Sequence, residues 1–316
     1  MRHFLTAAAL AAAIVAPHAA LADVTVYSAG PADLIQALAD GFTAKTGTKV
    51  DVFQATTGKV MARLESEAAN PVADVLISAS WATVDDFTKR DWLLPFTSAS
   101  EATVPDFLKT DNAVAQGVSA LAIAWNPTSG TPKPTDWADL TKPEYKDLVT
   151  MPDPAQSGSA YELVAALQAK FGWKLFEDLK ANGLIVAGAN AAALNPVLQG
   201  AKAAVFGAVD YISLAGKKKG ETIEVIFPSS GTIVAPRPAM IFKWSKNQDD
   251  AKAFVDYMLS DEGQQAVAAV ELMPARTDVK ADRLLIGDLT LLEGVSADEA
   301  TRKEILGHFA SIFGTN

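Results

Sequence analysis

The stretch VTVYSAGP at residues 24–31 decides the fold, because it is typical of a short β-branched strand whose small hydroxyl and glycine residues open a helix. Helix-spaced apolar residues follow over 31–46. The pattern repeats with a strand over 49–53, a helix over 59–69 and a strand over 73–77. Strands that alternate with helices predict a parallel sheet in an α/β fold, with ligands beyond the carboxyl ends of the strands.

A second α/β unit follows a buried strand predicted over 120–125. Its predicted strands lie at 148–151, 184–187, 203–207 and 224–227, and one helix is expected to begin at Asn195-Pro196. Another helix begins near Ala160, where Ser159 and Glu162 have the spacing of a capping box.

Two extended crossings are expected to join these units into two lobes with a ligand cleft between them, an arrangement that permits lobe closure. The crossings lie at 118–126 and 233–242, the first lobe at 23–117 and about 243–285, and the second lobe at 127–232. The helical segment 286–316 is assigned to neither lobe by its sequence.

Residues 1–22 have the pattern of a secretory signal peptide, with Arg2 ahead of an apolar stretch from Phe4 to Pro17. Small residues before Asp23 predict cleavage after Ala22. The apolar run is short for the roughly 30 Å of hydrocarbon in a bilayer. The sequence therefore predicts export, most simply into a bacterial periplasm.

Composition excludes several kinds of chemistry. The chain has no cysteine, and removal of the predicted signal peptide leaves His308, in a surface-type helix, as the one remaining histidine. Thiolate sites and histidine-dependent catalysis are therefore not expected. The formal net charge is −10, from 27 Lys and Arg against 37 Asp and Glu. Because nucleic acids bind basic surfaces, we expect no nucleic-acid partner.

Three turns rich in hydroxyl and glycine residues are the candidate binding elements. They are Ser28-Ala29-Gly30-Pro31, Thr56-Thr57-Gly58-Lys59 and Ser157-Gly158-Ser159-Ala160, and Ser78 follows the third strand in a similar place. The first N–H groups of a helix lack intrahelical partners and carry partial positive charge, so such turns hold anions. The alternative is that each turn is an ordinary helix N-cap.

Further motifs give the chain a resemblance to a known family. They are the opening Val24-Thr25-Val26-Tyr27-Ser28, Thr57 to Leu64, Ala73-Asp74-Val75, Asp136 to Leu140, Pro152-Asp153-Pro154 with Ser157-Gly158-Ser159, and Val234-Ala235-Pro236-Arg237-Pro238. Together with the predicted signal peptide, they resemble extracellular solute-binding proteins of ATP-driven importers. The chain is most similar to the branch that binds ferric iron, hexose phosphates and 2-aminoethylphosphonate.

The resemblance implies a two-lobed periplasmic binding protein of type II-like fold that works without catalysis or a cofactor. Its implied partners are a small anionic ligand and the membrane permease of an ABC importer, and a monomer is expected. Members that bind phosphorylated ligands surround the anion with hydroxyl and backbone donors from several loops. The candidates here are Ser28, Thr56, Thr57, Gly58, Ser78, Ser157, Gly158 and Ser159.

We expect Thr57-Gly58 and Ser157-Gly158-Ser159 to hold one anion from opposite sides of the cleft. Asp210, beside Tyr211, is expected to discriminate among ligands by pairing with an amino group or accepting sugar hydroxyls, with helix capping as its alternative role. Arg237 either adds a charge-assisted bond to the anion or lies on the hinge surface. Asp153 is expected to brace its own turn.

Two other functions stay open at this point. Iron-binding members carry adjacent tyrosines in the second lobe, whereas this chain has Tyr211 alone there, with Tyr27 as a further phenolate. A ferric site requires several oxygen ligands, which the sequence does not assemble. An exported hydrolase with Ser157 or Ser159 as nucleophile is the other alternative, although no base partner is evident for it.

Overall fold

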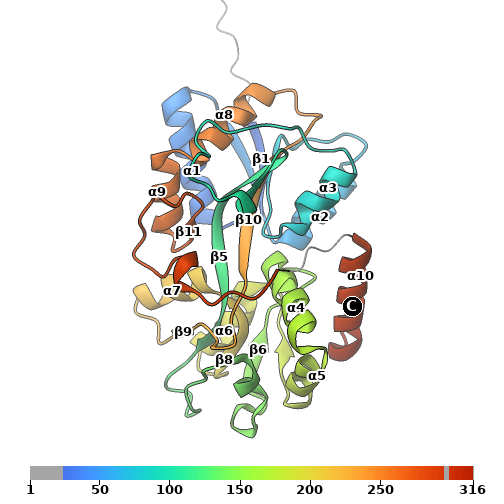
Figure 1. Cartoon of the computed structure of the whole chain (residues 1–316), viewed down its shortest axis with the longest axis vertical. Coiled ribbons are helices and arrows are strands. Elements are labelled where there is room, and N and C mark those ends of the chain that lie inside the picture. The colour runs from blue at the N-terminus through green and yellow to red at the C-terminus, as the bar shows by residue number, and fades with distance from the viewer. Residues whose placement is uncertain (1–23, 295–298, 316) are drawn as a thin grey trace, which may run out of the picture.

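The computed structural model describes residues 24–294 and 299–315, so the predicted signal peptide lies outside the described residues. Helices and strands alternate through two lobes, which confirms the predicted α/β class (Figure 1). The strands are β1 (Val24–Ser28), β2 (Val50–Gln54), β3 (Val75–Ile77), β4 (Lys109–Thr110), β5 (Ala113–Trp125), β6 (Val149–Met151), β7 (Ile185–Val186), β8 (Ala204–Val209), β9 (Glu224–Ile226), β10 (Val234–Ile241) and β11 (Met273–Pro274). The helices are α1 (Ala32–Thr46), α2 (Thr57–Ser66), α3 (Ala82–Lys89), α4 (Gly158–Phe171), α5 (Lys174–Ala181), α6 (Asn190–Leu198), α7 (Asp210–Lys218), α8 (Gln248–Met258), α9 (Asp261–Ala269) and α10 (Glu299–Phe313).

Helix α1 shows how the local sequence forms its element. Its buried side chains, Leu34, Ile35, Leu38, Ala39 and Phe42, recur at helical spacing and cover one face of the first-lobe sheet. The helix ends at Gly47, whose φ of 82° is the left-handed conformation that glycine adopts without strain. In the described part of the chain no helix is long and apolar enough to cross a membrane.

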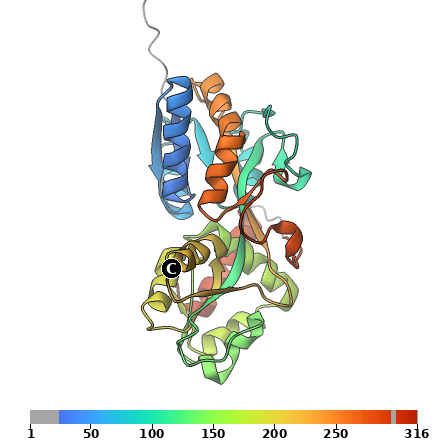
Figure 2. The same cartoon turned by 90° about the vertical axis from the view of Figure 1, so that its left-hand side faces the viewer.

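Strand β5 belongs to the sheets of both lobes. The strand order is β2-β1-β3-β10-β5-β8-β6-β7, with β1 parallel to β2 and β3, and β10 antiparallel to both β3 and β5. The first part of β5 pairs with β10 up to Ala120, and the part from Leu121 pairs with β8 and β9 in the second lobe. Every residue of β5 is buried, as is usual for a strand covered on both faces. Figure 2 shows this strand running from one lobe into the other.

The chain passes between the lobes a third time after β11. The backbone N–H of Thr277 donates to Thr103 O in the first lobe, and that of Leu292 donates to Thr232 O in the second. Helix α10 then packs against α4 and α5, with Phe309 against Phe176 at a ring distance of 6.1 Å. The segment that the sequence left unassigned therefore ends in the core of the second lobe (Figure 1).

We predict that Phe309→Ala lowers the free energy of unfolding by about 3–5 kcal/mol, because it removes a fully buried aromatic ring and leaves a cavity. Denaturant unfolding measures the change. Glu304→Ala, at an exposed position of the same helix, is the matched control and is expected to change stability by less than about 0.5 kcal/mol. Equal effects of the two substitutions would contradict the packing of α10 in this core.

Candidate ligand-binding cleft

A cavity of about 410 Å³ lies between the lobes, at the ends of strands from both. Its walls come from the β1–α1 and β2–α2 turns of the first lobe, the turns before α4 and α6 of the second lobe, the start of α7, and β10. The lining residues are Ala29, Gly30, Gln54, Ala55, Thr56, Thr57, Lys59, Ala79, Gln156, Ser157, Ala189, Asn190, Ala191, Tyr211, Ile212 and Arg237. Because both lobes contribute, a molecule in this cavity contacts both at once.

Arg237 on β10 gives the cavity a buried positive charge. The residue is 1% exposed, its Nη1 donates to Ala29 O at 3.2 Å, and its Nε has no hydrogen-bond partner in the described part of the chain. Its guanidinium lies 5.1 Å from the ring centre of Tyr211. Within residues 24–294 and 299–315, no carboxylate forms an ion pair with it. A buried charge without a counter-charge is costly, so this arginine favours an anion in the cavity.

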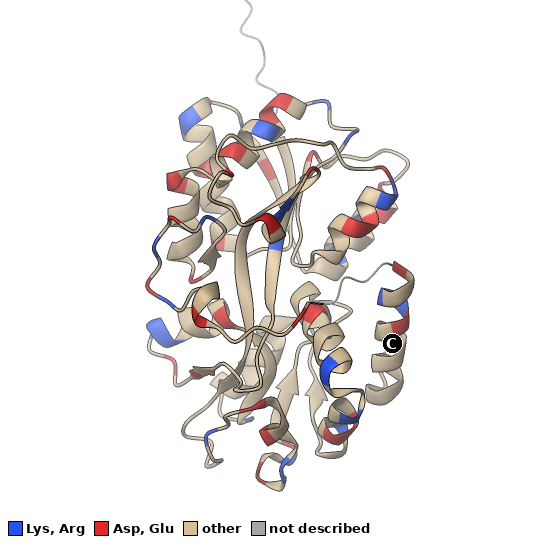
Figure 3. Cartoon of the chain, viewed as in Figure 1, with Lys and Arg blue, Asp and Glu red and all other residues tan. Residues whose placement is uncertain are grey.

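Hydroxyl groups add neutral donors to the same cavity. Thr56 Oγ1 is buried and has no hydrogen-bond partner among the residues that the structure describes. Ser157 caps α4 by accepting from the N–H of Ala160 at 3.3 Å, and its hydroxyl lies 3.1 Å from Asn190 Oδ1. Ser157 is therefore an N-cap and also a wall of the cavity, so its two possible roles are compatible. In the view of Figure 3, blue and red residues are interspersed over both lobes.

Gly58 and Gly158 bring the two lobes into direct contact. The N–H of Gly158 donates to Thr57 Oγ1 at 3.2 Å, and the N–H of Gly58 donates to Gln156 O at 3.4 Å. A Cβ on Gly158 would lie 2.9 Å from backbone atoms of Ala79, and one on Gly58 would lie 2.8 Å from Ala155 O. Here the two turns bind each other. Both glycine N–H groups therefore have partners in the opposite lobe, and the anion expected between the two turns stays a prediction.

Four of the predicted binding residues line the cavity and six do not. The four are Thr56, Thr57, Ser157 and Tyr211. The six are Ser28, Gly58, Ser78, Gly158, Ser159 and Asp210. The three serines among the six have local partners, because Ser28 accepts from Gly30 N, Ser78 pairs with Thr83, and Ser159 pairs with Ser157. Hydroxyls satisfied in this way stabilise their own turns.

Asp210 is directed away from the cavity, toward the third crossing. It is fully buried and forms an ion pair with Arg283, whose side chain is 2% exposed. It also accepts from the N–H of Tyr211 at 2.7 Å, at the start of α7. Asp210 does not line the cavity in this arrangement. Because the N-cap of α7 is Val209, the main contact of Asp210 is the ion pair with Arg283 and not a helix cap.

Glu162 does not form the capping box predicted from its spacing to Ser159, so that prediction is wrong. The N-cap of α4 is Ser157, and the carboxylate of Glu162 instead accepts from the Ser80 hydroxyl and from the N–H of Trp81 at 3.1 Å. It thus satisfies the start of α3 in the other lobe. Burial raises the pKa of Glu162, against the opposing effect of these hydrogen bonds. The contact adds a polar link between the lobes.

Of the two tyrosines considered as iron ligands, one lines the cavity and the other does not. Tyr27 is 1% exposed, donates to Glu67 Oε2 at 2.6 Å and does not line the cavity, whereas Tyr211 does. Burial and the neighbouring Glu67 raise the pKa of Tyr27 to about 12, which opposes phenolate formation. Among the described residues there is no group of three or more His, Cys, Asp or Glu suited to a metal ion. His308 is exposed on α10.

Sequence reasoning missed the side-chain amides of the cavity, and it included Lys59 in a candidate turn without assigning it to the site. Gln54, Gln156 and Asn190 all line it. Asn190 was missed because the helix start was placed at Asn195-Pro196, whereas α6 begins at Asn190 and contains Pro196. The strand-to-helix turn at residues 187–190 was the available signal, since the other cavity walls have the same form.

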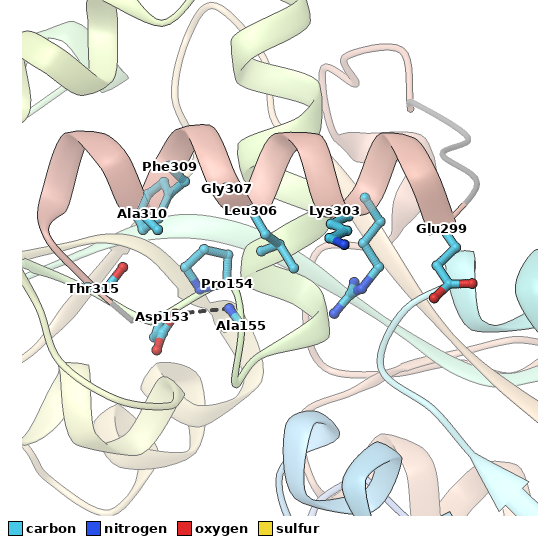
Figure 4. Close-up of a pocket in the computed structure, with 11 residues that line it drawn as sticks. Asp153, Pro154, Ala155, Glu299, Lys303, Leu306, Gly307, Phe309, Ala310 and Thr315 are labelled. Carbon is cyan, nitrogen blue, oxygen red and sulfur yellow. Dashed lines mark hydrogen bonds between the residues drawn. The ribbon is translucent and has the colours of Figure 1, made fainter. Parts of the chain in front are cut away.

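A second hollow, of about 420 Å³, lies outside the cleft between α10 and the turn at residues 153–155 (Figure 4). Leu306 and Phe309 line it together with Lys303 and Glu299, so its charges are mixed. Asp153 at its edge accepts from the N–H of Ala155 at 2.9 Å and from the amide of Gln156 at 2.8 Å, as expected for a residue that braces its own turn. We place the binding site in the interlobe cavity, because that cavity contains the buried arginine.

Comparison with known proteins agrees with this architecture. The profile of the family described as bacterial extracellular solute-binding protein matches residues 24–269. The chain belongs to this family. It is therefore a solute-binding protein and not an enzyme, which removes the hydrolase alternative.

The names of individual relatives indicate different ligands. The major ferric iron-binding protein of Neisseria meningitidis serogroup B is 28% identical over 287 residues, 85% of this chain and 86% of that protein. A putative 2-aminoethylphosphonate-binding periplasmic protein of Salmonella typhimurium is 24% identical, over 89% of this chain and 88% of its own. The periplasmic binding protein AfuA from Actinobacillus pleuropneumoniae, solved with fructose-6-phosphate, has the same fold, with a TM-score of 0.85, 21% identity, and coverage of 93% of this chain and 99% of that one.

We predict that Gly158→Ala weakens ligand binding by about tenfold or more, because its methyl group collides with the backbone of Ala79 and lowers the population of the closed form. Small-angle scattering of the liganded protein is expected to give a larger radius of gyration. Gly307→Ala is the control, since its methyl group meets nothing within 4 Å. Compact scattering and unchanged affinity for Gly158→Ala would contradict a role for this approach in closure.

Proposed function

We propose that this chain is the periplasmic substrate-binding component of an ABC importer, and that it captures a small phosphorylated or phosphonate anion by lobe closure. The proposed ligand class rests on one observation: Arg237 is buried in the interlobe cavity and has no carboxylate partner in the described chain. Thr56 and Ser157 supply neutral hydroxyls beside it. This combination suits the several oxygens of a phosphoryl group.

Closure follows from the position of the cavity between lobes. A ligand that contacts Arg237 and Thr56 on one side and Ser157 on the other stabilises the closed form relative to the open one. The closed protein then presents its cargo to a membrane permease. We propose that it does so as a monomer in the periplasm, after cleavage behind Ala22; the names of its relatives support the compartment.

Ferric iron is the second candidate, and it is favoured by relatives named as iron-binding proteins. The cavity supports it less well, because Tyr211 is the one tyrosine in its lining and Tyr27 is bound to Glu67 elsewhere. Iron bound through tyrosinate gives a visible charge-transfer colour, whereas a phosphorus compound does not. Calorimetric titration with phosphate esters, phosphonates and ferric citrate separates the two.

We predict that Arg237→Gln weakens binding of the best phosphorus ligand by roughly 10- to 150-fold, which corresponds to the loss of about 1.5–3 kcal/mol for a hydrogen bond to a charged group. Isothermal titration calorimetry measures the change. Lys252→Gln, at a side chain on α8 that is 43% exposed, removes the same charge outside the cavity and is expected to leave affinity unchanged. Tight ferric binding with colour, and no binding of any phosphorus compound, would overturn the proposed ligand class.

A further inference from the structure

The walls of the interlobe cavity hold cationic and amide side chains without any acid. Among the residues that the structure describes, no Asp or Glu lines it, although the whole chain has 37 acidic residues against 27 basic ones. Its charged residues are Arg237 and Lys59. We propose that the cavity selects phosphoryl ligands whose remaining part is neutral and hydroxylated, such as polyol or sugar phosphates, and rejects those that carry an ammonium group. This inference rests on the proposed function.

An ammonium group would find no counter-charge in this cavity. Asp210 is paired with Arg283, and Asp153 is bonded to Ala155 and Gln156. The ring of Tyr211, which is otherwise suited to a cation, lies under the guanidinium of Arg237 at 5.1 Å. Burying an ammonium ion beside the buried guanidinium of Arg237 and without a carboxylate carries a desolvation and repulsion cost, to which the exposed Lys59 adds weakly.

A neighbouring hollow of about 470 Å³ shares Ala191, Tyr211 and Ile212 with the cavity and has Asp33 and Glu221 on its border. Both acids are exposed. Water and salt screen charges at such positions, so they offset the cost of a buried ammonium ion weakly. The acids of the hollow therefore do not alter the selectivity of the cavity.

Three amide side chains fit the hydroxyls of the proposed ligand. Gln54 donates to Gly30 O at 2.9 Å, Gln156 donates to Asp153 Oδ2 at 2.8 Å, and Asn190 Oδ1 lies 3.1 Å from Ser157 Oγ. Each amide has both donors and acceptors, as a hydroxyl group does. Because these bonds fix the amides before a ligand arrives, little side-chain entropy is lost on binding. The volume of about 410 Å³ lies in the range of about 300–1,000 Å³ that is typical of sites for organic ligands.

The test is calorimetric titration of the purified mature protein with two matched pairs of compounds. The first pair is 2-aminoethylphosphonate and ethylphosphonate, which differ by the amino group. The second pair is glucose 6-phosphate and cyclohexyl phosphate, which differ mainly by the ring hydroxyls. We expect ethylphosphonate to bind at least about tenfold more tightly than its amino analogue, and the sugar phosphate at least about tenfold more tightly than its deoxygenated analogue.

Asn190→Asp supplies the missing carboxylate at a cavity wall while keeping an acceptor for the Ser157 hydroxyl. We expect it to shift the affinity ratio toward 2-aminoethylphosphonate by about tenfold and to weaken binding of glucose 6-phosphate. Thermal unfolding close to that of the parent protein verifies that the variant is folded.

The outcomes separate this inference from the proposed function. Equal or tighter binding of 2-aminoethylphosphonate in the parent protein, with Arg237→Gln still weakening all phosphorus ligands, overturns the selectivity and leaves the proposed function standing. An unchanged ratio in Asn190→Asp also overturns it. Absence of binding by every phosphorus compound overturns both.

Discussion

The contact between the turns that contain Gly58 and Gly158 sets the distance between the lobes. Each glycine places its N–H against a group of the opposite lobe, and neither position has room for a methyl group. Because the turns meet in this way, Thr57 and Ser157 become facing walls of one cavity, with Arg237 between them on a strand that pairs with β5. The arrangement of the cavity therefore depends on this close approach of the two turns, which both glycines permit.

The second interlobe link has a different chemical character. Glu162 reaches from α4 to the start of α3, where helix N–H groups have no intrahelical partner. A carboxylate at that place also complements the helix dipole. The lobes are therefore joined by a neutral contact at the turns and by an anionic contact beside it, while the cationic Arg237 has no carboxylate partner among the described residues.

The alternation of strands and helices was sufficient to predict the α/β class and the two extended segments between lobes, since these features depend on local sequence periods. The site was predicted in part. Thr56, Thr57 and Ser157 were found because strand-to-helix turns meet at one sheet edge. Asp210 was misjudged because its partner, Arg283, is 73 residues away, and Glu162 because its contact with Ser80 spans 82 residues. A local sequence pattern cannot predict pairings between residues so far apart in the chain, nor whether the side chain of Arg237 points into the cavity or to the surface.

The late position of α10 has a consequence for how the protein is made. Phe309 completes the core of the second lobe, and α8 and α9 complete that of the first, so neither core is whole until the last part of the chain is available. Closing such long-range contacts is slow, because the loop entropy is lost before the contacts form. A chain arranged in this way cannot complete either core until its synthesis is almost finished, so the full packing of both lobes forms only after the C-terminal segments are available.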